Sequence, residues 1–253
     1  MHMYSINIFV MIKTYRNFRT RNEFIDYLNL YPKHPTGRPD FVKLANIPPE
    51  CYQQELEAIL KNINHVKQDW NNQSINDIER SVAKKGQKQL DIMEAQRQEK
   101  LQAGYGLEQP MYRIKNCEPE SYFNKFAEDI GLEYSQSRYH VQFPGEVTAW
   151  HTDIFSPTHE FLVDYDDDQD DEFVGKDKNI RRIMIALQPW QRGHFLQFGY
   201  TPWIDWSAGD VIGWDYGVPH GSANMGYEPR ISVSITGKIT DKFAALNNHA
   251  RKL

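Results

Sequence analysis

Apolar residues in the first 130 positions recur mostly at helical spacing. After Pro48 and Pro49 one stripe repeats every three or four residues, and it consists of Tyr52, Leu56, Ile59, Leu60, Ile63, Val66 and Trp70. Residues three and four apart share one face of a helix, so this stripe predicts an amphipathic helix, which proline is well suited to start. We expect this helix to pack on a core.

Two further segments of this region also predict helices. A sparser stripe runs from Ser74 to Ala103, and the sequence leaves open whether residues 74–106 form a lid or an interface. A short helix is expected after Pro119, which suits a first turn, and it should end at Gly131, a typical terminator.

From Tyr134 onward the pattern changes to short runs of β type separated by Gly, Pro, Asn or Asp. The runs are Tyr139–Phe143, Val147–His151, Arg181–Gln188, Phe195–Gly199, Val211–Trp214 and Arg230–Thr236. Several short strands with turn signals between them predict a β-barrel or sandwich. We expect a mostly β, α+β protein with a mainly helical part at 1–133 that packs on the core, a β core at 134–240, and a tail at 241–253 that is a surface helix or disordered.

Composition narrows the class of protein. The chain has 253 residues, 40% of them hydrophobic, and a formal net charge of -5, which excludes disordered, collagenous and disulfide-scaffold classes. The longest apolar run near the start, Ile8–Ile12, is five residues long, whereas a bilayer-spanning helix needs roughly 20. It also lacks the features of a secretory signal. Cys51 and Cys117 are too few and too isolated for a thiolate metal site, and a cytoplasmic location is expected.

The most informative polar cluster is His151-Thr152-Asp153 together with the distant His220. On an extended chain His151 and Asp153 point to the same side and can bind one ion. A second imidazole from His220, on another strand, would complete a two-histidine, one-carboxylate face, which leaves three metal positions open and is typical of non-heme Fe(II) oxygenases. A His-x-Asp pattern by itself is common, and a surface or core histidine is the alternative interpretation.

Ten residues beyond His220, the run Arg230–Thr236 alternates strictly between polar and apolar residues. An ordinary half-exposed strand would show the same pattern. Arg230 and Ser232 on one face would also form a fork for a carboxylate, with guanidinium and hydroxyl donors. A keto acid anchored by Arg230 at its far end would supply the electrons that an iron site needs to activate oxygen.

With these motifs, residues 134–238 resemble the Fe(II)/2-oxoglutarate-dependent oxygenases. The resemblance includes Phe143-Pro144-Gly145-Glu146 before the metal pair, the glycine turn Trp206–Asp210, His220, Asn224 and Arg230-x-Ser232. It is strongest for the aspartyl/asparaginyl β-hydroxylase and prolyl hydroxylase branches, whose R-x-x-x-x-L strand matches Arg182–Leu187.

The resemblance implies a double-stranded β-helix, a cupin-like jelly roll. It implies that His151, Asp153 and His220 bind Fe(II), and that Arg230 and Ser232 bind 2-oxoglutarate. The other residues expected at the cofactor are Arg182, Asn224 and Gln142, which stands where prolyl hydroxylases carry a tyrosine.

The implied reaction consumes O2 and 2-oxoglutarate, releases succinate and CO2, and hydroxylates a C–H bond of an amino-acid side chain, either free or in a peptide. A carboxylate at Asp153 favours hydroxylation over halogenation, since halogenases of this superfamily have Gly or Ala there. Two alternatives remain open: a cupin-like metal-binding module, and an oxygenase on the same fold that does not use 2-oxoglutarate.

Lesser signals concern substrate and partners. Between residues 164 and 172 stand seven acidic side chains and no basic one, which predicts either a solvated loop or a surface that attracts a basic peptide or amino acid. Nucleic acid and membrane are disfavoured as partners, and the oligomeric state stays open. His140 and His194 neighbour strands without completing a ligand set, so we interpret both as ordinary core or surface histidines.

Overall fold

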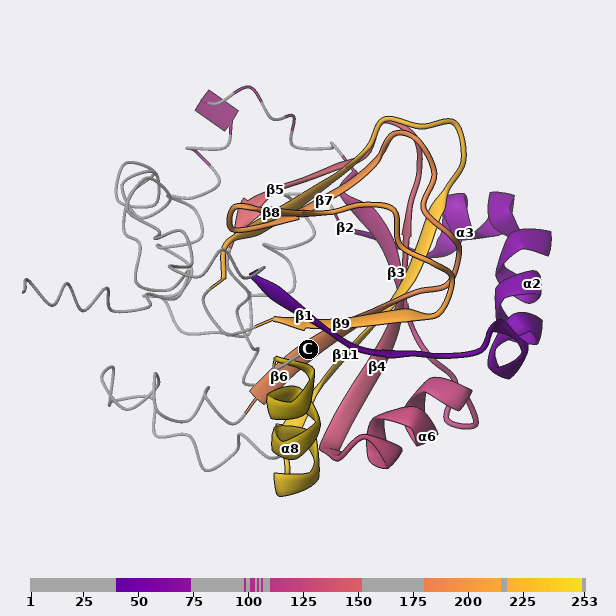
Figure 1. Ribbon diagram of the computed structural model, residues 1–253. Helices are drawn as coiled ribbons and strands as arrows, with labels where there is room; N and C mark the ends of the chain where they lie inside the picture. The colour runs from indigo at the N-terminus through magenta and orange to yellow at the C-terminus, as the bar shows by residue number, and fades with distance from the viewer. Residues whose placement is uncertain are drawn as a thin grey trace, which may run out of the picture.

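The computed structural model describes residues 40–73, 98, 101–102, 104, 106, 110–151, 180–214 and 218–251. These residues build two antiparallel sheets (Figure 1). The large sheet has the strand order β1 (Phe41–Asn46), β9 (Asp210–Trp214), β6 (Ile180–Ala186), β11 (Arg230–Ile239), β4 (Leu132–Gln142), β3 (Tyr112–Asn116) and β2 (Asn71–Gln73). The small sheet has the order β5 (Val147–His151), β10 (His220–Asn224), β7 (His194–Phe198) and β8 (Thr201–Trp203).

From β4 onward the chain alternates between the sheets. β4, β6, β9 and β11 lie in the large sheet, whereas β5, the β7–β8 pair and β10 lie in the small one. β11, the last strand, pairs with β4, the first, and β10 pairs with β5, so the two ends of the region close on each other. This winding is the double-stranded β-helix, and it confirms the predicted fold.

The helices are η2 (Pro49–Cys51), α2 (Gln53–Lys61), α3 (Ile63–Asp69), α6 (Tyr122–Asp129) and α8 (Asp241–Ala250). The prediction of one continuous helix over 52–70 was wrong, because Asn62 leaves helical geometry at φ -109° and its side-chain amide donates to the Ala58 carbonyl at 2.9 Å. The helix expected after Pro119 is α6, with Ser121 as its N-cap and Gly131 following at φ +87°. α8 forms most of the predicted tail and buries Phe243.

The part before residue 134 is not only helical. β1 pairs with β9 at one edge of the large sheet, and β3 pairs with β4 toward the other. The segments alternate over only five or six residues, too briefly to stand out beside the long stripe of Tyr52–Trp70. Most of the predicted helix Ser74–Ala103, and with it the question of a lid or interface, lies outside the described residues.

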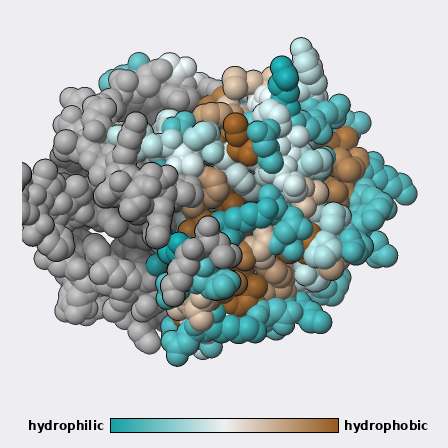
Figure 2. All heavy atoms as spheres, in the orientation of Figure 1, coloured by the Kyte–Doolittle hydropathy of each residue, from teal (hydrophilic) through white to brown (hydrophobic). Residues whose placement is uncertain are grey.

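The large sheet separates two apolar cores. The outer core lies between the sheet and the helices and includes Ile59, Val66, Phe123, Ile183, Ile185, Ile231, Val233, Ile235 and Phe243. The inner core lies between the sheets and is rich in tryptophan: Ala186, Leu196, Phe198, Trp203, Trp206, Ile212, Trp214 and Val218. Figure 2 shows hydrophilic side chains over the region where α2 lies, as expected for a helix with only one buried stripe.

β11 contributes to both sides of the large sheet. Its isoleucines and valine lie in the outer core, and its polar residues Arg230, Ser232, Ser234 and Thr236 are only 5–9% exposed. The alternative of a half-exposed strand was therefore wrong: the polar face is buried toward the small sheet. Within the described part of the chain, no helix is long and apolar enough to cross a membrane.

Candidate functional site

Two of the predicted metal ligands lie side by side on the small sheet. His220 begins β10 and His151 ends β5, and the two residues are direct partners in the antiparallel ladder. Their ring centroids are 4.3 Å apart with 54° between the ring planes. Strand pairing thus brings together two histidines that are separated by 68 residues in the chain. The predicted metal site of two histidines and one carboxylate requires this.

Both imidazoles are oriented by backbone carbonyls. His151 Nδ1 lies 2.8 Å from the Ala149 carbonyl oxygen, and His220 Nδ1 lies 3.0 Å from that of Val218. A carbonyl only accepts hydrogen bonds, so Nδ1 carries the proton in each ring and the neutral ring has its lone pair on Nε2. Metal-binding histidines usually have this second contact, since it fixes the ring and the tautomer.

Aromatic side chains lie next to His220. The rings of Trp214 and Phe198 lie 5.3 Å and 5.4 Å from that of His220, measured between centroids. Asp153, the third predicted ligand, lies outside the described residues, and so does the acidic run at 164–172. Among the residues that are described, no group of three His, Cys, Asp or Glu side chains could hold a metal.

Arg230 lies on the inward face of β11, next to Gln142 of β4. It is only 9% exposed, and its Nε and Nη1 atoms have no hydrogen-bond partner within the described part of the chain. Burial lowers the pKa of Arg230 to about 9. A buried cation without a counter-ion is costly, so this guanidinium is a strong candidate for binding an anion, and buried Ser232 follows it on the same face.

Gln142 and Asn224 turn out to hold the two sheets together. The Gln142 amide nitrogen lies 3.0 Å from the Met111 carbonyl and 3.2 Å from the Ser222 hydroxyl. Asn224 Nδ2 donates to the Gln142 and Glu228 carbonyls, both at 2.8 Å. These donors are engaged by protein atoms, which gives both side chains a structural role beside the one expected at a cofactor.

Arg182 lies toward the opposite end of β11 from Arg230. It is the ladder partner of Thr236 on one side and of Trp214 on the other, and its Nε donates to the Thr236 hydroxyl at 2.9 Å. Arg138 of β4 belongs to the same region, and its pKa is lowered by burial and by the nearby charge of Arg182. This part of the barrel is therefore cationic and lies away from Arg230.

The histidines interpreted as ordinary core or surface residues are both on the inward faces. His140 Nε2 lies 2.8 Å from the Ser234 hydroxyl, and its ring stacks on Tyr112. His194 is 2% exposed, and its Nδ1 has no hydrogen-bond partner among the described residues. One sequence signal could have placed it: His194 alternates with Leu196 and Phe198, which face the inner core.

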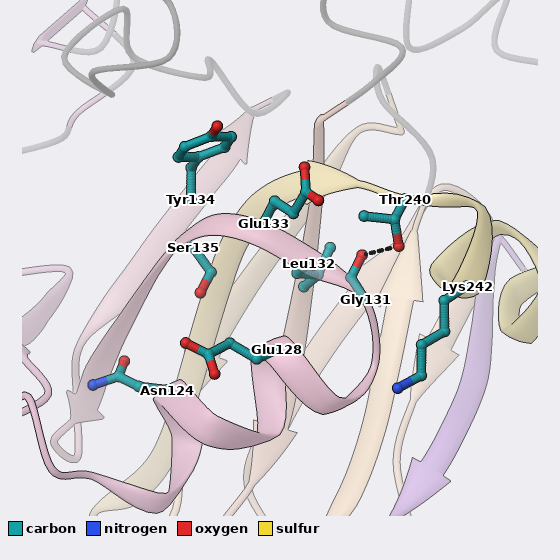
Figure 3. A pocket seen from close by; sticks show the side chains of 9 residues that line it. All are labelled: Asn124, Glu128, Gly131, Leu132, Glu133, Tyr134, Ser135, Thr240 and Lys242. Atoms are coloured by element: carbon teal, nitrogen blue, oxygen red, sulfur yellow. Dashed lines mark hydrogen bonds between the residues drawn. The ribbon is translucent and has the colours of Figure 1, made fainter.

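A separate hollow of about 670 Å³ lies on the outside of the large sheet (Figure 3). It is lined by Asn124, Glu128, Gly131, Leu132, Glu133, Tyr134, Ser135, Thr240 and Lys242. The dashed line in Figure 3 is the hydrogen bond from the Thr240 hydroxyl to the Gly131 carbonyl, which joins the turn after α6 to the N-cap of α8. None of the lining residues belongs to the predicted chemistry, so the inward faces remain the candidate site.

Comparison with known proteins gives matches of structure only. No family model matches the chain, and no curated protein matches it. A prolyl-4-hydroxylase from Pseudomonas putida has 14% identity and a TM-score of 0.47, over 85% of this chain and 97% of that chain.

Two other solved structures match with lower TM-scores. A Cupin 2 conserved barrel domain protein from Salinispora arenicola has 14% identity and a TM-score of 0.30, over 58% of this chain and 92% of that one. KdgF from Halomonas sp. has 13% identity and a TM-score of 0.30, over 52% and 84% respectively. At such low similarity, function has to be argued from the residues of the site.

Proposed function

We propose that this protein is a non-heme Fe(II)/2-oxoglutarate-dependent dioxygenase that hydroxylates a C–H bond of an amino-acid side chain and releases succinate and CO2. The observation that carries the proposal is Arg230: a buried guanidinium on an inward face, with two donor atoms lacking partners in the described structure. A carboxylate bound to this guanidinium would offset the free-energy cost of burying its charge.

The donor set at the other end fits a ferrous ion. His151 and His220 would bind it through Nε2, since their Nδ1 atoms are held by carbonyls, and we propose Asp153 as the third ligand. Two imidazoles and a carboxylate suit Fe(II) and leave positions for 2-oxoglutarate and O2. When bound, the iron would supply the redox chemistry that couples decarboxylation of the keto acid to oxidation of the substrate.

The residues between the two ends support one orientation of the proposed cosubstrate. Gln142, the ladder partner of Arg230, reaches Ser222, which follows His220 by two residues, or about 7 Å along a strand. We propose that the keto-acid end of 2-oxoglutarate lies at the imidazoles and that its far carboxylate lies at Arg230 and Ser232. Around His220, the rings of Trp214 and Phe198 would keep water away from the reacting atoms.

The substrate is proposed more broadly. Seven acidic residues at 164–172 follow the first two proposed ligands in sequence, and carboxylates attract cations. We propose an amino-acid side chain, free or in a peptide and of basic character. Neutralising the seven acids should raise the Michaelis constant for such a substrate, and an unchanged constant would reject this part.

The test of the proposed function is 2-oxoglutarate-dependent succinate release by the purified chain with Fe(II) and ascorbate, run without a substrate to detect uncoupled turnover. Calorimetry with Mn(II) in place of iron measures 2-oxoglutarate binding separately. Arg230→Gln should abolish both signals, while Arg192→Gln, which changes an exposed arginine, should leave both unchanged. His220→Ala should weaken metal binding itself.

Two other results would each select another function. Metal binding without any 2-oxoglutarate binding would indicate a cupin-like module. Oxygen consumption that survives Arg230→Ala would indicate an oxygenase that does not use 2-oxoglutarate, because losing the charged partner of a carboxylate costs several kcal/mol.

A further inference from the structure

Four buried polar residues from both sheets meet at the Arg230 end of the barrel. Across the ladders, Arg230 of β11 lies opposite Gln142 of β4, and His194 of β7 lies opposite Asn224 of β10. Asn224 joins the two pairs, because its Nδ2 donates to the Gln142 carbonyl at 2.8 Å. All four side chains are between 1% and 9% exposed. They therefore form one desolvated polar cluster, which we call the carboxylate end.

His194 is the unexplained member of this cluster. Its Nε2 lies 3.2 Å from the Glu228 carbonyl oxygen, so the proton of the neutral ring belongs on Nε2. Its Nδ1 is buried and has no partner in the described structure. The ring lies almost parallel to Trp206, with 13° between the planes and 6.2 Å between the centroids, which fixes where Nδ1 points. Core packing alone leaves that nitrogen unsatisfied.

The protonation state of His194 depends on what lies beside it. Burial lowers its pKa, and the charge of Arg230 lowers the pKa further. Among the described residues, the charge that acts on the ring is that of Arg230. Arg192, two residues before it, and Glu228, which it contacts through the backbone carbonyl, are both exposed. Without an anion the ring is thus neutral near pH 7, and Nδ1 is a lone pair. An anion between the two side chains would offset the guanidinium and favour a proton on Nδ1.

We infer that His194 and Arg230 together anchor the far carboxylate of the dicarboxylic cosubstrate, and that His194 takes up a proton at Nδ1 when the carboxylate binds. The inference rests on the proposed function and adds a second anchoring residue to it. The proton comes from solvent and the imidazolium donates to the carboxylate. Gln142 is unsuited to this role, because its amide nitrogen is engaged by Met111 and Ser222 and its unpartnered atom is the oxygen, an acceptor.

A linked proton gives the binding a defined pH dependence. One proton taken up per ligand makes the affinity for 2-oxoglutarate rise by up to tenfold for each unit that the pH falls, between the pKa of His194 in the free protein and in the complex. Pyruvate has the same keto-acid end without the far carboxylate. Its binding should therefore involve no proton uptake and should not depend on His194.

The experiment is calorimetry of 2-oxoglutarate and of pyruvate into the full chain already loaded with Mn(II), at about pH 7.5, in two buffers of different ionisation heat. Loading the metal first keeps the proposed ligand histidines from titrating. The difference between the binding heats in the two buffers gives the number of protons taken up. We expect close to one proton for 2-oxoglutarate and none for pyruvate.

Two substitutions test the two ring nitrogens of His194 one at a time. His194→Gln keeps a donor for the Glu228 carbonyl but has no proton to offer at the Nδ1 position, and should weaken 2-oxoglutarate roughly 10- to 100-fold with loss of proton uptake. His194→Asn places an uncharged donor near the Nδ1 position, and should restore part of the affinity without proton uptake. His65→Gln, which changes an exposed histidine of α3, is the matched control and should behave like the wild type.

The outcomes distinguish the inference from the proposed function. Wild-type protein that binds 2-oxoglutarate without proton uptake, or a His194→Gln variant with unchanged affinity, would overturn the role of His194 and leave Arg230 as the anchor. Mn(II)-loaded wild-type protein that fails to bind 2-oxoglutarate would overturn the proposed function itself. If His194→Gln does not fold, the proton counts of the wild type with the two acids decide the question.

Discussion

Replacing Arg230 with methionine should make the ligand-free protein more stable. Arg230 is 9% exposed, and burial lowers its pKa from 12.5 to about 9. At neutral pH that shift means that the charged form of Arg230 costs about 5 kcal/mol in the folded protein relative to the unfolded chain. Methionine has a similar length, no charge and adaptable packing. Apolar replacement of buried ionic groups is stabilising by about 1–4 kcal/mol in favourable cases, which is the gain we expect from Arg230→Met.

Urea or thermal unfolding of the metal-free and ligand-free protein measures this effect. For a chain of this size, about 1 kcal/mol raises Tm by about 2–4 °C. The stabilised variant should nevertheless lose 2-oxoglutarate binding. Wild-type protein with Mn(II) should gain about 2.7 kcal/mol at a 2-oxoglutarate concentration 100 times its Kd, and Arg230→Met should gain nothing from the keto acid. Arg192→Met controls for the loss of an exposed arginine.

The pH dependence gives an independent check. The pKa of Arg230 is lower in the folded protein than in the unfolded chain, so above about pH 9 the unfolded chain holds more protons at this site. The free energy of unfolding of the wild type therefore rises with pH in this range. The extra stability of Arg230→Met over the wild type should be full at pH 7 and smaller near pH 10. A variant less stable than the wild type at pH 7 would refute the reasoning, because it would show that the guanidinium is already compensated in the ligand-free protein.

Three further predictions test other parts of the structure. His220→Ala should weaken Mn(II) binding about 100-fold or more in calorimetry; an unchanged affinity would place the metal elsewhere. Arg113→Met leaves Glu146 buried without its 2.7 Å ion pair and should cost about 3–5 kcal/mol in urea unfolding, most of it recovered by adding Glu146→Gln. Gly209→Ala puts a methyl group 1.8 Å from the Ile47 carbonyl oxygen at φ +84°, so its Tm should fall by several degrees, and an unchanged Tm would contradict that geometry.

Local chemistry explains which elements could be predicted. α6 was predicted from Pro119, which suits a first turn, and from the terminator Gly131, two signals that lie 12 residues apart. β11 alternates strictly, so its two faces are evident. β10 was placed only through His220, because its sequence His-Gly-Ser-Ala-Asn has no β-branched or aromatic residue to signal a strand. This segment is a strand because it pairs with β5 on one side and β7 on the other.

The role of His194 shows the same limit within the site. Its position in the β7 alternation indicates the face it occupies, but nothing near it in sequence indicates Arg230, 36 residues later on a strand of the other sheet. Burial is likewise a property of the assembled barrel. The polar face of β11 has the same sequence whether it meets solvent or the small sheet. Only the second case buries Arg230 and leaves its Nε and Nη1 atoms without a partner among the described residues.

The sequence by itself therefore determined the secondary structure with strong periodicity, the double-stranded β-helix through its motifs, and the residue types able to bind iron and a carboxylate. Tertiary structure decided that His151 and His220 pair across two strands, that β1 and β3 extend the large sheet, and that Arg230 and His194 share one desolvated end. The physical reason is range: propensity, capping and alternation act between neighbours in the chain, whereas ligand geometry and the free energy of a buried charge depend on strands brought together from distant positions.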